Sequence, residues 1–252
     1  MGIDVQHLCK RFGRTAAVDD ATFRVEPGER VALVGRNGAG KTTLLRLLAT
    51  FLPATSGRAT VSGFDLFSQS NAVREITGYL PEGSPVHPDM GVAEYLRFRG
   101  RLRRMPGPRL RRRLHDVLDF CELAALRTAP IRSLSAGQKR AVGLADAILH
   151  EPDVLLLDDP LAALDPVQAR KISAMVASPE VSEGRVVLFS THDAAFVRAA
   201  ATRAICLEHG RVVADARDLA PLAERDLPAM LDAWRGAAEA AAPAAAEGRA
   251  AP

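Results

Sequence analysis

The stretch "GRNGAGKT", residues 35–42, has the residue types and spacing needed to hold phosphate groups. It fits the pattern G-x-x-x-x-G-K-[S/T] between a predicted strand and a predicted helix, which is the context that this pattern requires. Its glycines let successive backbone N–H groups point inward at phosphate oxygens, and the following helix adds the positive end of its dipole. Lys41 supplies charge for the β- and γ-phosphates of a nucleotide, and the Thr42 hydroxyl is a ligand for Mg²⁺. The glycine spacing, followed by lysine, excludes a dinucleotide-binding fingerprint.

A second chemical feature is the pair of carboxylates that ends the apolar run "LLLDD", residues 155–159. A buried strand ending here places both carboxylates at the carboxyl edge of a parallel sheet, where such sheets bind ligands. Asp158 can hold Mg²⁺ through its water shell, and Asp159 can polarise an attacking water as a general base. Two aspartates that only cap a turn are the alternative. The phosphate loop earlier in the chain favours the catalytic interpretation.

The elements that must position these motifs alternate between strand and helix patterns. Short apolar or alternating runs predict strands over 3–9, 20–29, 30–35, 57–63, 76–83, 153–158, 185–190, 203–210 and 211–216. Apolar residues at helical spacing predict helices over 41–52, 92–105, 108–123, 136–150 and 193–201, and another from Pro166. This order predicts an α/β fold: a P-loop NTPase core with a mostly parallel sheet, N-terminal antiparallel strands and an inserted helical subdomain.

We expect a single domain over residues 1–222, with the helical subdomain over about 86–150 inserted in it. A short C-terminal helix is predicted over 223–235, where Leu227, Met230, Leu231 and Trp234 recur at helical spacing. Residues 236–252 are rich in Ala and Pro and have almost nothing to bury, which predicts a disordered tail.

Composition narrows the class of protein. The 252 residues are 48% hydrophobic and 25% charged, which is typical of a globular protein, with a net charge of only +3. No run of eighteen apolar residues predicts a membrane span, and the N-terminus lacks the apolar core of a signal peptide, so a cytoplasmic location is expected. Three scattered cysteines indicate neither a disulfide framework nor a zinc site. Aromatic residues do not interleave with the arginines, so no nucleic acid is expected as a partner.

Five motifs occur along the chain in a fixed order: "GRNGAGKT", "LSAGQ", "LLLDDP", "LAALD" and "STHD". Together they resemble the nucleotide-binding subunit of an ATP-binding cassette (ABC) transporter, over roughly residues 3–215. The resemblance implies ATP and Mg²⁺ as cofactors, a second ABC subunit as a partner, and a separately encoded polytopic membrane permease. It implies nucleotide contacts from Gly35, Arg36, Asn37, Gly38, Ala39, Gly40, Lys41, Thr42, Thr43, Ser135, Ala136, Gly137, Gln138, Phe12, Glu82, Asp165 and His192.

Roles for these residues also follow from the resemblance. The signature segment 135–138 would complete the ATP site of the partner subunit, and a helix start is physically suited to bind an anion. His192 would contact the γ-phosphate, and Asp165 would link the two sites across a dimer. Phe12 would stack on adenine. Taken alone, a strand-end histidine is more often structural, and Phe12 is equally consistent with a core aromatic.

Three positions depart from the family's usual pattern. Ala136 stands where the signature usually has Gly, and Glu82 stands where the family usually has a Gln that senses Mg²⁺ and the membrane partner. An acid at Glu82 could itself bind the metal. Asp159 replaces the usual catalytic Glu and is shorter by roughly 1.5 Å. Because a misplacement of about 1 Å can cost on the order of 100-fold in rate, we expect slow hydrolysis unless the backbone advances toward the nucleotide.

The resemblance of "GYLPE" to the branch of gliding-motility, drug and lipid exporters favours export, by a subunit peripheral to the inner face of the cell membrane. An ATP-gated regulatory cassette with little hydrolysis, or half of a heterodimer with one degenerate site, is the alternative that Asp159 supports. A cassette acting on ribosomes or DNA is less favoured, because the chain has one cassette and no coiled-coil insertion. Nine arginines between Arg97 and Arg113 suit either solvated helix faces or anionic lipid headgroups.

Overall fold

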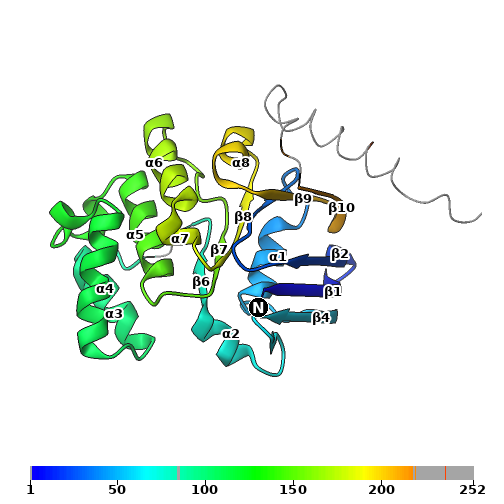
Figure 1. The fold of residues 1–252 in the computed structure, drawn as a ribbon, viewed down its shortest axis with the longest axis horizontal. Helices are drawn as coiled ribbons and strands as arrows, with labels where there is room; N and C mark the ends of the chain where they lie inside the picture. The colour runs from blue at the N-terminus through cyan, green and yellow to red at the C-terminus, as the bar shows by residue number, and fades with distance from the viewer. Residues whose placement is uncertain (1, 84–85, 218, 220–235, 237–252) are drawn as a thin grey trace, which may run out of the picture.

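The computed structural model describes residues 2–83, 86–217, 219 and 236 (Figure 1). The predicted C-terminal helix over 223–235 lies outside these residues, as does the predicted tail apart from Gly236. Among the helices in the described part of the chain, none is both long and apolar enough to cross a membrane.

The N-terminal part forms a four-stranded antiparallel sheet in the order β2-β1-β4-β5. Its strands are β1 (Ile3–Phe12), β2 (Thr15–Val25), β4 (Ser56–Val61) and β5 (Phe64–Asp65). Hydrophobic residues of β1 such as Ile3, Val5 and Leu8 are fully buried, while residues between them face outward. The predicted antiparallel strands are confirmed.

A six-stranded sheet in the order β10-β9-β3-β8-β7-β6 forms the centre of the molecule. Its strands are β3 (Arg30–Val34), β6 (Thr77–Leu80), β7 (Val154–Leu157), β8 (Val186–Thr191), β9 (Arg203–Glu208) and β10 (Arg211–Ala216). Only β10 pairs in the antiparallel sense. The predicted mostly parallel sheet is therefore confirmed, and the carboxyl ends of five strands meet along one edge.

Both faces of this sheet are covered, because its strands alternate buried side chains between two cores. Along β7, Val154 and Leu156 join one core, whereas Leu155 and Leu157 join the other. The first core contains α1 (Lys41–Leu48) and lies toward the antiparallel sheet (Figure 1). The second contains helices of the inserted block. Each leucine fully buried in this way contributes about 1.5 to 3 kcal/mol to folding.

Helices fill the stretch from residue 92 to residue 148 and lie together at the end of the molecule away from the antiparallel sheet (Figure 1). They are α3 (Val92–Leu102), α4 (Gly107–Phe120), the 3₁₀ turns Ala124–Leu126 and Ile131–Ser133, and α5 (Ala136–Ile148). The other helices are α2 (Ser70–Ile76), α6 (Pro166–Ala177), α7 (Pro179–Ser182) and α8 (Ala194–Ala200).

Part of the arginine cluster has a structural role at the end of α5. Arg113 donates to the carbonyls of Ile148 and Leu149 in the last turn of the helix, where carbonyls lack partners further along the helix. Arg103 donates to Nε2 of His150 over 3.0 Å. Burial, reinforced by Arg103, lowers the pKa of His150 to about 3, so this ring is neutral and accepts the bond. Exposed members of the cluster are Arg97, Arg101, Arg104, Arg109, Arg111 and Arg112.

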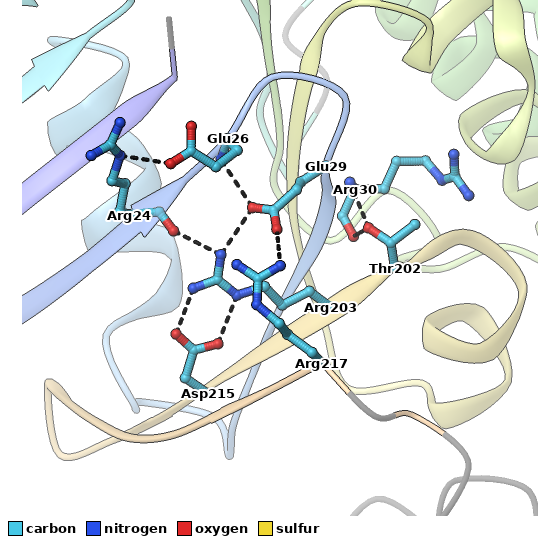
Figure 2. Close-up of polar contacts among 8 residues, drawn as sticks. All are labelled: Arg24, Glu26, Glu29, Arg30, Thr202, Arg203, Asp215 and Arg217. Carbon is cyan, nitrogen blue, oxygen red and sulfur yellow. Dashed lines mark hydrogen bonds and ion pairs between the residues drawn. The ribbon is translucent and has the colours of Figure 1, made fainter.

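At the amino edge of the central sheet, a network of ion pairs surrounds Arg203, the first residue of β9 (Figure 2). This side chain is buried and donates two bonds to the Asp215 carboxylate, over 2.7 and 2.5 Å. Its Nη1 donates to Glu29 and to the carbonyl of Arg24, over 2.9 and 2.8 Å. Arg217 binds the other oxygen of Glu29. The network ties β2, β9 and β10 to the turn before β3.

Candidate active site

The phosphate loop follows β3 and leads directly into α1. Gly40 immediately precedes the helix with φ of 104°, a left-handed conformation that favours glycine. A Cβ at this position would lie 2.2 Å from the carbonyl oxygen of Ala17. Glycine is therefore required by both the backbone conformation and the space, and the tight turn it permits brings residues 37–42 around one cavity.

Lys41 lies within this loop rather than out in solvent. Its Nζ donates to the carbonyls of Gly35 and Arg36, over 2.7 and 3.0 Å. Burial lowers the pKa of Lys41, and the nearby carboxylates of Asp159 and Asp158 oppose that shift. A desolvated ammonium group at the end of a glycine-rich loop is an arrangement suited to bind a polyphosphate.

Asp158 lies at the carboxyl end of β7 and is 1% exposed. Its Oδ1 accepts hydrogen bonds from Thr42 Oγ1 at 3.0 Å and Ser190 Oγ at 2.8 Å. Its Oδ2 is buried without a hydrogen-bond partner among the described residues. Leaving such an atom unpaired is costly, and a hard cation would satisfy it.

The residues present fit a Mg²⁺ ion that is bound together with the phosphates of a nucleotide. No group of three or more His, Cys, Asp or Glu side chains in the described part of the chain could hold a metal by itself. Mg²⁺, however, commonly keeps several waters and takes one or two protein ligands together with phosphate oxygens. Asp158 Oδ2 and the Thr42 hydroxyl, which faces the same carboxylate, supply such a pair.

Asp159 has a different environment, although it is the next residue. Its backbone φ of 39° is unusual for a non-glycine residue. Its Oδ2 lies 3.2 Å from Nδ1 of His192, and its N–H donates to Ser190 Oγ over 2.8 Å. Burial raises the pKa of Asp159; His192 opposes this shift and Glu82 reinforces it. A raised pKa makes the carboxylate a stronger base, which suits acceptance of a proton from water.

These side chains border one cavity of ≈ 340 Å³ at the carboxyl edge of the sheet. Its lining includes many of the residues predicted from the sequence: Asn37, Gly38, Ala39, Gly40, Lys41, Thr42, Thr43, Glu82, Asp158, Asp159 and His192. Ala17 and Ser190 line it as well and were not predicted. Ser190 lies near the end of β8, directly after Phe189, which pairs with Leu157 of β7. It is therefore level with Asp158, and its position at a strand end was a signal that the sequence offered.

The ABC transporter family model matches residues 18–162, which is more than half of the chain. The chain belongs to the ABC transporter family. It is 36% identical over 190 residues to an uncharacterized ABC transporter ATP-binding protein of Bacillus subtilis, YxlF, covering 75% of this chain and 62% of that protein.

Relatives with opposite transport directions are similar to this ABC chain. A Nod factor export ATP-binding protein I of Ralstonia nicotianae is 31% identical over 85% of the chain and 67% of its own length. A sulfate/thiosulfate import ATP-binding protein CysA of Burkholderia mallei is 36% identical over 84% of the chain and 61% of its own length. The chain thus spans 61% to 67% of the length of these three relatives.

Solved structures of ABC proteins share the fold. A structure described as the ATP binding subunit of an ABC transporter matches with a TM-score of 0.80 and 25% identity, over 92% of this chain and all of that one. A dimeric ATP-binding cassette in a post-hydrolysis state, bound to ADP and Pi, matches with a TM-score of 0.76 and 23% identity, over 85% and 97% of the two chains.

The remaining predicted residues of the ABC motifs do not line the cavity. Ser135 caps α5: its Oγ accepts from Gln138 N, and Gln138 Oε1 accepts from Ser135 N. Asp165 caps α6 by accepting from the N–H groups of Val167 and Gln168. Both motifs therefore form a helix N-terminus in this chain.

Phe12 ends β1 and is 51% exposed, so the core-aromatic alternative is wrong. The ammonium group of Lys10 lies 5.0 Å from the centre of its ring. An exposed ring with a cation beside it is compatible with stacking on a nucleobase. The Phe12 side chain is nevertheless outside the cavity lining.

Proposed function

We propose that this ABC chain binds and hydrolyses ATP as a dimer with a second ABC subunit and drives a separately encoded polytopic membrane permease. One observation carries the proposal. A single cavity brings together the phosphate loop, the unpaired buried oxygen of Asp158, and the Asp159–His192 pair. These are the groups required to bind a magnesium nucleotide and to activate a water beside it.

Each group has a part in the reaction that its position supports. The N–H groups of residues 37–42 and the Lys41 ammonium would bind the β- and γ-phosphates. Thr42 and Asp158 would hold Mg²⁺, which neutralises charge on the phosphates when it is bound. Asp159 would accept the proton of the attacking water, and His192, 3.2 Å from it, would orient that carboxylate toward the γ-phosphate.

The dimer is supported by the helix N-termini that lie away from the cavity. Ser135 Oγ accepts one hydrogen bond in the capping box, but its own proton can still be donated to an anion. We propose that the segment 135–138 covers the nucleotide of a second subunit and that Asp165 contacts that subunit. The dimeric cassette with the same fold supports this arrangement.

Export from the cytoplasm is the direction we propose, with the subunit held at the inner face of the membrane by its permease. The "GYLPE" segment and the similarity to a Nod factor export protein support export. Similarity to a sulfate/thiosulfate import protein supports the opposite direction, so transport itself must be measured.

Purification of the tagged chain from detergent-solubilised membranes of its native host tests the proposal. We expect a polytopic membrane protein and either a second copy of this chain or a different cassette to co-purify, identified by mass spectrometry. In proteoliposomes the complex should hydrolyse MgATP. Recovery of the chain without a membrane protein, together with no hydrolysis, would contradict the proposal.

A regulatory cassette that binds ATP but hardly hydrolyses it is the second candidate function. The observation that favours it is the short Asp159 side chain, whose carboxylate is engaged with His192. Under this alternative, MgATP would stabilise the dimer while single-turnover hydrolysis stayed very slow. The effect of lengthening Asp159, described below, distinguishes the two functions.

A further inference from the structure

Arg140 is a buried arginine of α5 that binds backbone carbonyls of other segments. It lies two residues after the segment 135–138 and is 3% exposed. Its guanidinium group donates to five backbone carbonyls, at distances from 2.6 to 3.0 Å. The five acceptors are the carbonyl oxygens of Pro81, Glu82, Asp158, Asp159 and Pro160.

These carbonyls belong to two segments that border the cavity. Pro81 and Glu82 directly follow β6, and residues 158–160 directly follow β7. Nη1 binds the first segment, Nη2 binds the carbonyls of Asp158 and Asp159, and Nε binds that of Pro160. One planar group therefore fixes the spacing between the backbone of Glu82 and the backbone of Asp159.

The backbone of Asp159 needs such support. Its φ of 39° is a conformation that costs free energy for a non-glycine residue and persists only where the surroundings impose it. Three consecutive carbonyls, from residues 158 to 160, turn inward to the Arg140 guanidinium, while the Asp159 N–H turns to Ser190. This turn directs the Asp159 carboxylate toward His192.

Arg140 also carries the positive charge that binding these carbonyls requires. Burial lowers its pKa to about 10, and the carboxylates of Asp159 and Asp158 oppose the shift, so the group stays positive at neutral pH. A guanidinium offers five N–H donors in one plane, whereas a lysine offers three donors from a single atom. Lysine at this position would keep the charge but leave carbonyls unpaired.

We propose that Arg140 is a positioning residue for hydrolysis, which acts through backbone carbonyls to hold Asp159 and Glu82 at a fixed separation. The inference rests on the proposed function, because it assigns the reaction at this cavity to Asp159. It also implies that α5, whose first turn carries the segment 135–138, is tied through Arg140 to the chain's own catalytic turn.

The test is Arg140→Lys in the purified full-length chain, alone and combined with Asp159→Asn. Because a displacement of about 1 Å can cost on the order of 100-fold in rate, we expect kcat for MgATP to fall about 10- to 100-fold. KM should change less than about threefold. In the Asp159→Asn background, the same substitution should change the residual rate less than about twofold, since Arg140 acts through Asp159.

Arg203→Lys is the matched control, because Arg203 is also buried and also binds several acceptors, but at the opposite edge of the sheet. It should lower Tm and leave kcat per folded molecule unchanged within about twofold. An equal rate loss from Arg140→Lys in the wild-type and Asp159→Asn backgrounds, or no loss at all, would overturn the proposal. If the lysine variant does not fold, Arg140→Gln, which keeps amide donors, takes its place under the same criteria.

Amide hydrogen exchange separates failure of this inference from failure of the proposed function. Arg140→Lys should speed exchange at Asp158, Asp159 and Ala162, whose N–H groups are hydrogen-bonded in or beside the turn. Faster exchange there, in a wild-type chain that proves unable to hydrolyse ATP, supports the positioning role and contradicts only the proposed function. Active wild-type chain with unchanged exchange in the variant overturns the positioning role alone.

Discussion

The central sheet gathers charged side chains at both of its edges, and the two groups differ in how far their charges are matched. At the amino edge, Arg203 binds two carboxylates and a carbonyl, and Arg217 satisfies the remaining oxygen of Glu29. At the carboxyl edge, Asp158 keeps a buried oxygen without a partner in the described structure, and Asp159 has a raised pKa.

This difference separates a group that stabilises the fold from a group that is prepared for a ligand. A buried charge with its partners in place is structural, and removing one partner leaves the other uncompensated. Perturbed and unpaired groups in a cavity indicate a functional site instead. Substitutions at the amino edge should therefore change folding, and substitutions at the carboxyl edge should change chemistry.

Lys41→Ala should produce the largest effect. Loss of a charged donor to the phosphates should lower MgATP hydrolysis on the order of 1000-fold, comparable to removal of a preorganised donor from other active sites. Nucleotide binding measured by equilibrium dialysis should weaken as well. Lys171→Ala is the control, since this exposed lysine pairs with Glu122 on the surface. Unchanged ATP affinity in Lys41→Ala would contradict the assignment of the phosphate loop.

Arg203→Leu should break the amino-edge network and lower the free energy of unfolding by about 3 kcal/mol, because Glu29 and Asp215 lose a buried partner. Urea denaturation measures this loss. Arg217→Leu, at the exposed rim of the same network, should cost less than about 1 kcal/mol. The comparison fails if Arg203→Leu lowers the rate of hydrolysis per folded molecule while leaving the free energy of unfolding unchanged.

Asp159→Glu should increase single-turnover hydrolysis by up to about 100-fold, because the added methylene moves the carboxylate toward the water. Asp158→Glu adds the same methylene one residue earlier. It should instead weaken the binding of Mg²⁺, so that hydrolysis requires a higher Mg²⁺ concentration, since Asp158 lies against Thr42. Rapid-quench measurements of both variants test this. An equal or slower rate for Asp159→Glu would show that the turn already places the shorter side chain correctly.

The smallest expected effect concerns His150, a buried ring that lies beside the positive charge of Arg103. Its folded pKa of about 3 lies below the ordinary value of 6.5, because burial and Arg103 disfavour a second positive charge. The folded chain therefore binds fewer protons than the unfolded chain between these values, and stability is lost as pH falls through this window. From pH 7 to pH 5 the loss should be about 1 to 2 kcal/mol.

Urea denaturation of His150→Gln at the same two pH values gives the matched measurement. Glutamine can accept the Arg103 hydrogen bond but does not titrate, so its loss of stability between pH 7 and pH 5 should be smaller than that of the wild type. Identical pH dependence in the two proteins would show that His150 does not contribute.

The sequence was sufficient for the order and type of most elements, because hydrophobic periodicity determines which faces are buried. It predicted β3, β7 and β8 to within about two residues, since their apolar runs are short and bounded. It missed α2 and α7, which are short helices with few buried residues. It extended the helix from Lys41 to residue 52, whereas α1 ends at Leu48 and Thr50 has φ of 60°.

The sequence predicted the site residues that belong to a recognisable motif. It did not predict residues whose contacts form only when distant segments come together in the fold. Residues 37–43, Asp158, Asp159 and His192 were found in one cavity, as expected from strand ends that meet at one edge. Arg140 was not identified, because its partners are backbone carbonyls of segments 18 to 59 residues away. An arginine among the buried positions of α5 was the available signal.

The alternation of faces along β7 limits how this chain can change. A substitution leaves each side chain on its own face, but loss of one residue within Val154–Leu157 would turn the following acids to opposite faces. The carboxylate that now meets Thr42 would then face the helices, and its neighbour would face α1. Insertions and deletions within this strand should therefore abolish function, whereas substitutions leave the two acids on their own faces.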